Sequence, residues 1–242
     1  MRFPQYAIVL GAIMLALSQC ATTPPGPAED FALQPGDLLF QDLDCGPLCE
    51  AIGAVTEGVH GARFAHVGMV TDASGPVYVI EATSQGGVIE TPLEAFLHKS
   101  HDAQGNPQVV VGRVRPPHDA LIPDAIAAAR ERLGAPYDPV YILGTGEYYC
   151  SELVHEAFRD ANGGEDVFET EPMTFKAPET DETFPAWEEH YAALGLPIPE
   201  GEPGLNPGGM SRAPFVGIVH VYGAPTGWDP PADGASYGAA PR

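Results

Sequence analysis

The feature that most constrains the fold is a cysteine, Cys150, at the start of an amphipathic segment. Glycines precede it, and Gly163-Gly164 is a signal for a helix C-terminus. Apolar residues recur between them at helical spacing: Leu153, Val154, Ala157, Phe158 and Ala161. The sequence therefore predicts a helix that begins at Cys150. Free N–H groups and the helix dipole favour a thiolate there, so Cys150 is either a nucleophile or a buried structural cysteine.

Composition narrows the possible partners. The chain has 242 residues, of which 11 are Lys or Arg and 33 are Asp or Glu, with a net charge of −22. Nucleic acid and anionic membrane surfaces are poor partners for such a field, and general solubility is the simpler interpretation of a charge this diffuse. We therefore expect no nucleic acid as a partner. The hydrophobic fraction of 44% is ordinary for a globular protein with a sizeable core.

The first residues resemble a targeting segment. Met1-Arg2 gives a positive start, and residues 7–17 form an apolar run that is too short to span a bilayer. The run ends in Leu17-Ser18-Gln19-Cys20, which resembles a bacterial lipobox, although Gln19 replaces the usual small residue. We expect residues 1–20 to be a signal peptide with Cys20 as the lipidated N-terminus; a plain secretory signal is the alternative. Residues 21–30 are expected to be a flexible tether to the periplasmic side of the outer membrane.

The other cysteines divide into a pair and a single residue. Cys45 and Cys49 are close enough in sequence to form a disulfide in an oxidising compartment. A metal site is a weaker interpretation, because no matching His or second Cys pair lies nearby. Cys150 is left without a partner, and an odd thiol in an exported protein is a candidate reactive group.

The remaining pattern predicts one α+β domain over residues 31–224. Thr91-Pro92-Leu93-Glu94 is interpreted as a capping box that opens a short helix. Residues 164–214 are expected to form a long excursion, either a lid or a substrate-shaping loop, and residues 225–242 a disordered tail. Strands are expected near 38–40, 64–71, 77–83, 108–114 and 215–222, and helices near 47–58, 123–133 and 186–194.

Cysteine catalysis needs a base and a group that orients the base. Of the eight histidines, His66 is the best candidate, because it opens an apolar strand and Gly68 follows it. His155 would point to another side of the Cys150 helix. If the hairpin turn is at Ala73-Ser74 or Ser74-Gly75, His66 shares a face with Glu81, whereas a three-residue loop would separate them. A surface histidine and an outward-facing glutamate are the alternatives.

Several motifs together resemble the circularly permuted, NlpC-type papain-like family, in its YiiX-like branch. They are Ala65-His66-Val67-Gly68-Met69-Val70, Tyr78-Val79-Ile80-Glu81-Ala82, Tyr148-Tyr149-Cys150-Ser151-Glu152-Leu153-Val154, Pro35-Gly36-Asp37-Leu38-Leu39-Phe40 and Leu133-Gly134-Ala135-Pro136-Tyr137. The histidine precedes the cysteine, which is the order of the permuted group. The resemblance implies an antiparallel sheet packed against the cysteine helix, with Cys150 as nucleophile, His66 as base and Glu81 as orienting residue.

These observations predict a monomeric cell-envelope cysteine hydrolase that cleaves an amide without a metal or organic cofactor. Backbone N–H groups at the helix start are expected to hold the oxyanion, with Ser151, Tyr149 and Tyr137 as oxyanion or substrate-shaping residues. Peptidoglycan peptides are the first substrate class expected. Lipid-like amides or esters, acyl transfer, and non-catalytic binding of a peptide or lipid are the alternatives.

Overall fold

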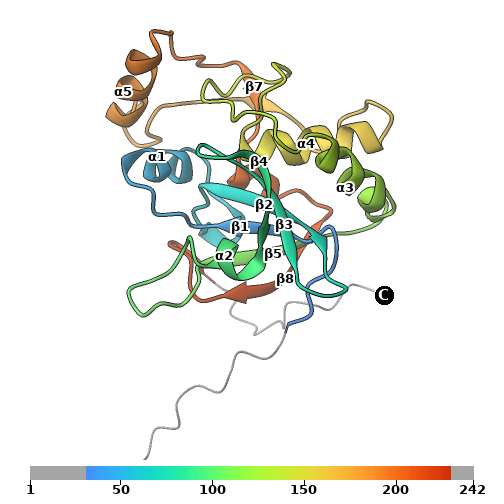
Figure 1. Cartoon of the computed structure of the whole chain (residues 1–242). Helices are drawn as coiled ribbons and strands as arrows, with labels where there is room; N and C mark the ends of the chain where they lie inside the picture. The colour runs from blue at the N-terminus through green and yellow to red at the C-terminus, as the bar shows by residue number, and fades with distance from the viewer. Residues whose placement is uncertain (1–30, 230–242) are drawn as a thin grey trace, which may run out of the picture. The chain divides into compact units, whose positions relative to one another are not determined.

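An antiparallel six-stranded sheet forms the centre of the computed structural model, which describes residues 31–229 (Figure 1). Its strand order is β4-β3-β2-β1-β5-β8, and every neighbouring pair is antiparallel. The strands are β1 (Leu38–Gln41), β2 (His66–Asp72), β3 (Tyr78–Thr83), β4 (Gly87–Pro92), β5 (Val109–Val114) and β8 (Val216–Tyr222). The predicted signal peptide, Cys20 and the tether, as well as residues 230–242, lie outside the described residues.

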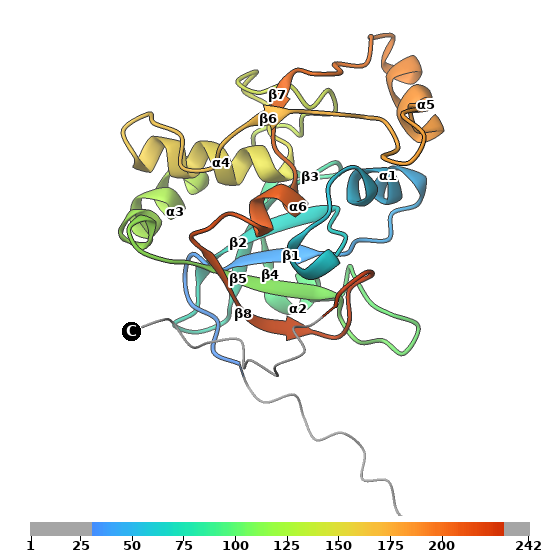
Figure 2. The same ribbon diagram turned by 180° about the vertical axis from the view of Figure 1, so that it is seen from behind.

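Helices lie on both faces of this sheet. They are α1 (Pro47–Val55), α2 (Leu93–Leu97), α3 (Ile122–Glu131), α4 (Cys150–Ala161), α5 (Pro185–Leu194) and α6 (Pro207–Ser211), with 3-10 turns η1 (Val59–Gly61) and η2 (His118–Leu121). Figures 1 and 2 show α3 and α4 side by side on one face. On the other face, the Phe96 ring of α2 lies against Gly68 of β2, where a Cβ atom would collide with it.

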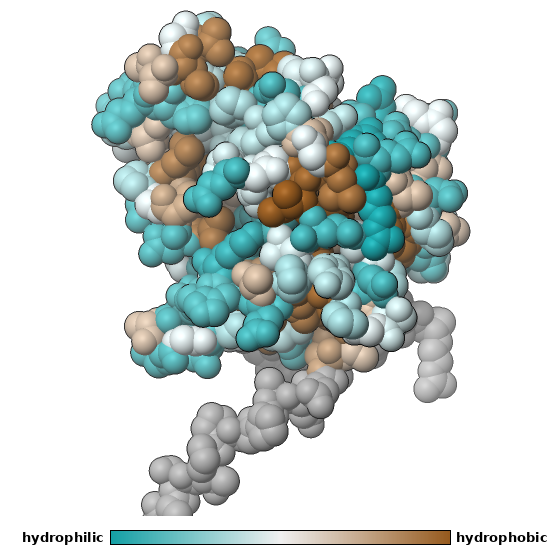
Figure 3. Space-filling view, viewed as in Figure 1, coloured by the Kyte–Doolittle hydropathy of each residue, from teal (hydrophilic) through white to brown (hydrophobic). Residues whose placement is uncertain are grey.

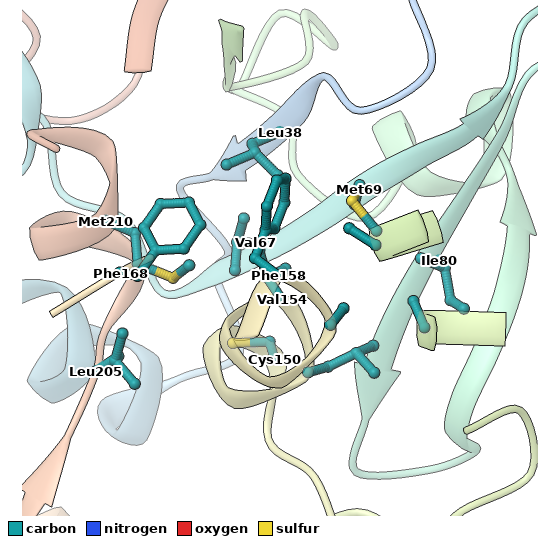
Figure 4. Close-up of a cluster of buried hydrophobic side chains, with 14 of the residues drawn as sticks. Leu38, Val67, Met69, Ile80, Cys150, Val154, Phe158, Phe168, Leu205 and Met210 are labelled. Atoms are coloured by element: carbon teal, nitrogen blue, oxygen red, sulfur yellow. The ribbon is translucent and has the colours of Figure 1, made fainter. Parts of the chain in front are cut away.

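The main core lies between α4 and the sheet. Val154 and Phe158 on α4 pack with Val67, Met69 and Ile80 from the strands (Figure 4). The apolar side chains of α4 are buried while Arg159 and Asp160 are exposed, which is the segregation that the helical spacing predicts, and Glu152 in the first turn is a buried exception. The predicted α+β fold, with an antiparallel sheet packed against the cysteine helix, is therefore confirmed.

One local prediction is wrong. Residues 87–92 form the edge strand β4, which the sequence analysis did not predict, and Thr91 belongs to this strand rather than capping α2. The residue that precedes α2 is Pro92, and no side chain caps the helix. The local capping pattern does not form, because Thr91 pairs with Val79 on β3 and its hydroxyl donates to Glu81 rather than accepting a hydrogen bond from a backbone N–H group of α2.

The β2–β3 hairpin has the register that brings His66 and Glu81 to one face. Met69 pairs with Ile80, which is the register expected for a turn at Ser74-Gly75. A bulge between Val70 and Asp72 widens the connection without changing the face of either strand near the site.

The excursion, residues 164–214, is folded and carries its own small core. It contains α5, α6 and the short pair β6 (Glu171–Pro172) and β7 (Pro203–Gly204). Figures 1 and 2 both place α5 beside α1. Phe175, Trp187 and Tyr191 pack there against Ala51 of α1.

The folded chain continues past the predicted domain boundary at 224. The N–H group of Thr226 donates to Asp42 at 2.7 Å, and Trp228 packs edge-on against His60. Within residues 31–229, no helix is long and apolar enough to cross a membrane. On the face seen in Figure 3, hydrophobic side chains lie in separate groups, one of them at the top over the end of α5, where Leu194 and Leu196 are exposed.

Candidate active site

Cys150 is the first residue of α4 and lines a large cavity. The residue is 7% exposed, and the backbone N–H groups of Val67 and Ser151 donate to its sulfur. Cys45 and Cys49 form a disulfide with a Cα–Cα distance of 5.4 Å, so Cys150 is the free thiol among residues 31–229. Figure 4 shows Cys150 at the start of the helix, where α4 meets β2.

His66 bridges the thiol and a carboxylate. Its Nε2 atom lies 2.7 Å from Oε2 of Glu81, and the Cys150 thiol is its other side-chain hydrogen-bond partner. Because Nε2 is hydrogen-bonded to Glu81, Nδ1 is the ring nitrogen available to interact with the Cys150 sulfur. The three side chains come from β2, β3 and α4. The residues are at least 15 positions apart in the sequence, and the fold brings them together.

Glu81 is fully buried and fully hydrogen-bonded. Oε2 accepts from His66, while Oε1 accepts from the Thr91 hydroxyl at 2.5 Å and from the Lys99 ammonium group. A buried carboxylate would otherwise be neutral, so these donors are what allow Glu81 to stay ionised. Glu81 is therefore buried in the protein and is not the outward-facing glutamate of the alternative interpretation.

The electrostatics favour a thiolate–imidazolium pair. Burial alone would lower the pKa of His66, but hydrogen bonds to Cys150 and Glu81 outweigh it and raise this pKa to about 9. Burial opposes ionisation of Cys150 as well, yet the bond to His66 and its positive charge lower the pKa of the thiol. Glu81 follows the same pattern: against the effect of burial, His66 and Lys99 bring its pKa to about 2.

The cavity above Cys150 has a volume of about 1080 Å³ and is large enough for a drug-sized or dipeptide-sized ligand. The excursion forms much of its wall, with Phe175, Trp187 and Leu205 among the lining residues. The loop before α4 contributes Tyr137 and Tyr141. The lining also includes the carboxylates of Glu57, Glu169 and Glu171.

The three predicted shaping residues have different surroundings. The Tyr137 hydroxyl lies 3.2 Å from that of Tyr141, and both phenols are close enough to Cys150 for its charge to raise their pKa, after the larger effect of burial. The Ser151 hydroxyl donates to the Leu205 carbonyl at 3.1 Å, and the Tyr149 hydroxyl accepts from the Leu205 N–H group at 3.3 Å. The side chains of Tyr149 and Ser151, on either side of Cys150, therefore bind the start of α4 to Leu205 in the excursion.

Tyr141 was not predicted from the sequence, and its backbone is unusual. Its φ of 60° is left-handed, a conformation that costs free energy for a residue with a side chain. The Asp138 carboxylate stabilises the turn by accepting N–H groups from Val140 at 2.7 Å and Ile142 at 2.8 Å. An aspartate that accepts the N–H group two residues further on, as Asp138 does from Val140, is a common turn pattern. This pattern in the sequence is therefore too common to identify a site.

The start of α4 is held by a second buried carboxylate, Glu152. One oxygen accepts from the Gly144 N–H group at 2.9 Å and the other from the Tyr149 N–H group at 3.4 Å. Burial is the main reason why the pKa of Glu152 rises to about 7. Its bonds connect the loop that carries Tyr141 to the helix that carries Cys150.

Other histidines are not part of this arrangement. His155 is buried on α4 with its Nε2 atom 3.7 Å from Asp166, and His98 and His101 contact each other at 2.8 Å on the surface. Within residues 31–229, no three His, Cys, Asp or Glu side chains converge in a geometry that could hold a metal ion.

Comparison with known proteins identifies a family and agrees with the fold. Residues 32–220 match the family described as "Permuted papain-like amidase enzyme, YaeF/YiiX, C92 family". The chain is 32% identical over 136 residues to the uncharacterized protein YiiX of Escherichia coli K12, an alignment that covers 55% of this chain and 62% of YiiX. It also resembles a crystal structure described as metalloprotein yiiX from E. coli O157:H7, with 26% identity and a TM-score of 0.64 over 79% of this chain and 98% of that one.

Proposed function

The chain belongs to the permuted papain-like amidases of the YaeF/YiiX family and is therefore an amide-cleaving cysteine hydrolase, and on that premise we propose that Cys150, His66 and Glu81 perform the cleavage. The observation that carries the proposal is the chain of contacts from Cys150 through His66 to a buried, ionised Glu81. This is the nucleophile–base–orienting group arrangement of acyl-transfer enzymes.

In the first half of the reaction, the Cys150 thiolate attacks the amide carbonyl carbon, and the C=O π electrons move to the oxygen. The N–H groups in the first turn of α4, which lack intrahelical acceptors, bind this oxyanion. A hydroxyl of the Tyr137–Tyr141 pair assists, because one mutual hydrogen bond leaves one of the two O–H donors unused. As the C–N bond breaks, His66 gives its proton to the amine, which leaves a thioester on Cys150.

In the second half, neutral His66 takes a proton from water while the water oxygen attacks the thioester. The C–S bond then breaks, which releases the acid and restores the thiolate–imidazolium pair. Glu81 stays ionised throughout and stabilises the imidazolium at Nε2. Proton transfer by a positioned base of this kind contributes about 10²–10⁴-fold in rate.

We place the enzyme in the cell envelope, as a monomer anchored through Cys20 to the periplasmic side of the outer membrane, acting on peptidoglycan peptides. The N-terminal pattern and the Cys45–Cys49 disulfide support an exported protein. The apolar lining of the cavity favours a second candidate, an amide or ester with a lipid-like group.

The decisive experiment is incubation of the purified protein with muropeptides and, separately, with N-acyl amides, followed by mass spectrometry. Release of product from one set by the wild type, and from neither by Cys150→Ala, assigns the substrate class. A stable adduct on Cys150 with no turnover would favour acyl transfer. Binding without turnover or adduct would favour a non-catalytic binding protein and would remove Cys150 from the proposed role.

A further inference from the structure

We propose that the cavity contains a second recognition site, at Trp187, for a neutral hydrogen-bond acceptor on the substrate. The inference rests on the proposed function and adds a requirement on the substrate. The bound molecule carries, besides the scissile amide, a carbonyl or ether oxygen embedded in an apolar group. The indole N–H group of Trp187 donates to that oxygen.

The evidence begins with an unsatisfied donor. Trp187 is 3% exposed and lines the cavity, and its Nε1 atom is buried without an acceptor among residues 31–229. Buried donors of this kind are rare in folded proteins because each lacks the hydrogen bond that it had in water. An acceptor brought by a ligand would restore that bond, whereas a purely hydrocarbon ligand would not.

The surroundings of Trp187 decide which kind of acceptor fits. Its ring meets Phe175 and Tyr141 edge to face, at centroid distances of 5.0 Å and 5.3 Å. Ile52, Met173 and Phe184 are among the apolar side chains packed on the same cluster. The imidazole beside the Trp187 ring belongs to His190, at a centroid distance of 5.8 Å, and its Nε2 atom is already hydrogen-bonded to the Pro139 carbonyl at 2.7 Å. Carboxylates also line the cavity, so a neutral oxygen, rather than a further anion, is the acceptor that the site favours.

Tyr141 connects this site to the reaction centre. Its ring contacts Trp187, and its hydroxyl lies beside that of Tyr137, within the electrostatic range of Cys150. Its left-handed backbone is held by the Asp138 carboxylate, and α5 is fixed to the same loop by the hydrogen bond from the Tyr191 hydroxyl to the Val140 carbonyl at 2.8 Å. A substrate held at Cys150 would therefore continue over Tyr141 to Trp187.

The chain contains two tryptophans, and this makes the test direct. In Cys150→Ala protein with ¹⁵N-labelled indoles, Trp187→Phe and Trp228→Phe assign the two N–H resonances. The first probe is N-acetyl-leucine N-methylamide. The second is 2-isobutyl-4,N-dimethylpentanamide, in which four carbons replace the acetamide group. Phenylalanine analogues of both extend the series.

We expect the acetylated probes to move the Trp187 indole proton downfield, as a new hydrogen bond does, while the carbon isosteres do not. Because Nε1 is covered in the ligand-free chain, the ring has to shift on binding, and the same resonance reports this movement. The Trp228 resonance stays in place, since Trp228 packs on His60 away from the cavity lining. No downfield shift with any acetylated probe, or an equal shift with its isostere, would overturn the inference.

Affinity gives a second readout. Trp187→Phe keeps an aromatic ring and removes the donor, so it should weaken the acetylated probes about three- to tenfold and leave the isosteres within twofold. The NMR test uses the intact side chain and does not depend on how well this variant folds. A protein that shows the Trp187 shift but no Cys150-dependent turnover would refute the proposed function alone; turnover without the shift would refute only this inference.

Discussion

The charge network behind Cys150 and the excursion wall of the cavity differ in how completely their polar groups are satisfied. On the sheet side, both oxygens of Glu81 are bonded, and His66 has a partner at each ring nitrogen. On the excursion side, an aromatic cluster surrounds a buried N–H group without an acceptor. A preorganised charge network needs nothing from the substrate in order to form, whereas the excursion is completed by a ligand.

This difference suggests a division of roles. Changes on the sheet side should act on the chemical step, and changes on the excursion side should act on binding. The following predictions, ordered from the largest expected effect to the smallest, test that division.

The largest effect is expected for His66→Ala. Loss of the base and of the imidazolium charge should lower kcat about 10²–10⁴-fold and slow the alkylation of Cys150 by iodoacetamide at pH 7. The exposed His101→Ala serves as the control and should change neither rate. An unchanged alkylation rate in His66→Ala would contradict the pair, because the thiol pKa would then not depend on His66.

Glu81→Gln should have the next largest effect, of the order of 10²-fold on kcat. It removes the charge that stabilises imidazolium, leaves the Lys99 ammonium group without its carboxylate, and so lowers the pKa of His66. The basic limb of the pH–rate profile should move to lower pH. Lys99→Met is the matched control, since it removes the opposing positive charge and should leave that limb in place or move it upward.

The pH dependence of the wild type should show a smaller, graded change. Activity should rise with pH as Cys150 ionises at a pKa below its usual value, and should fall about tenfold per unit above pH 9 as His66 loses its proton. The stability follows from the same shifts. The contribution of His66 is complete below pH 6.5 and is lost as pH rises through about 9; that of Glu81 is complete above pH 4.5 and is lost as pH falls to about 2. Rate profiles and melting curves measure the two separately.

The smallest effect is expected where the excursion meets the helix. Tyr149→Phe removes the acceptor of the Leu205 N–H group, and Ser151→Ala removes the donor to its carbonyl. Each loss is worth about 1 kcal/mol, so KM should rise roughly fivefold while kcat changes less than twofold. A larger change in kcat than in KM would mean that the excursion takes part in the chemical step.

The sequence predicted the sheet side of the site better than the excursion side, and the reason is physical. His66 and Glu81 lie on adjacent strands, where period-two alternation and turn length determine the shared face. The position of Cys150 at the start of a helix follows from the helical spacing of the apolar residues after it. Thr91 was misread because its neighbours mimic a capping box, and only the β3–β4 register shows that its hydroxyl reaches Glu81.

The residues that were missed depend on contacts across long stretches of chain. Lys99 is an ordinary surface lysine by sequence, and it becomes a partner of Glu81 only because α2 covers that face of the sheet. Trp187 and Tyr141 meet across more than forty residues of chain that include α4 and β6, and no periodic pattern in the sequence connects the two positions. The fold class was accessible from local patterns, but the composition of the cavity wall was not.

The short disulfide has a consequence for how the thiol reaches the folded protein undamaged. Cys45 and Cys49 are separated by four positions and precede Cys150 by a hundred, so they emerge together and can close without waiting for the sheet. In an oxidising compartment, a pair that closes first leaves neither of its two thiols available for mispairing with Cys150. An activated thiolate is the species that attacks disulfides fastest, and burial in α4 then removes it from such exchange. The order of cysteines along the chain thus protects the group that the fold makes most reactive.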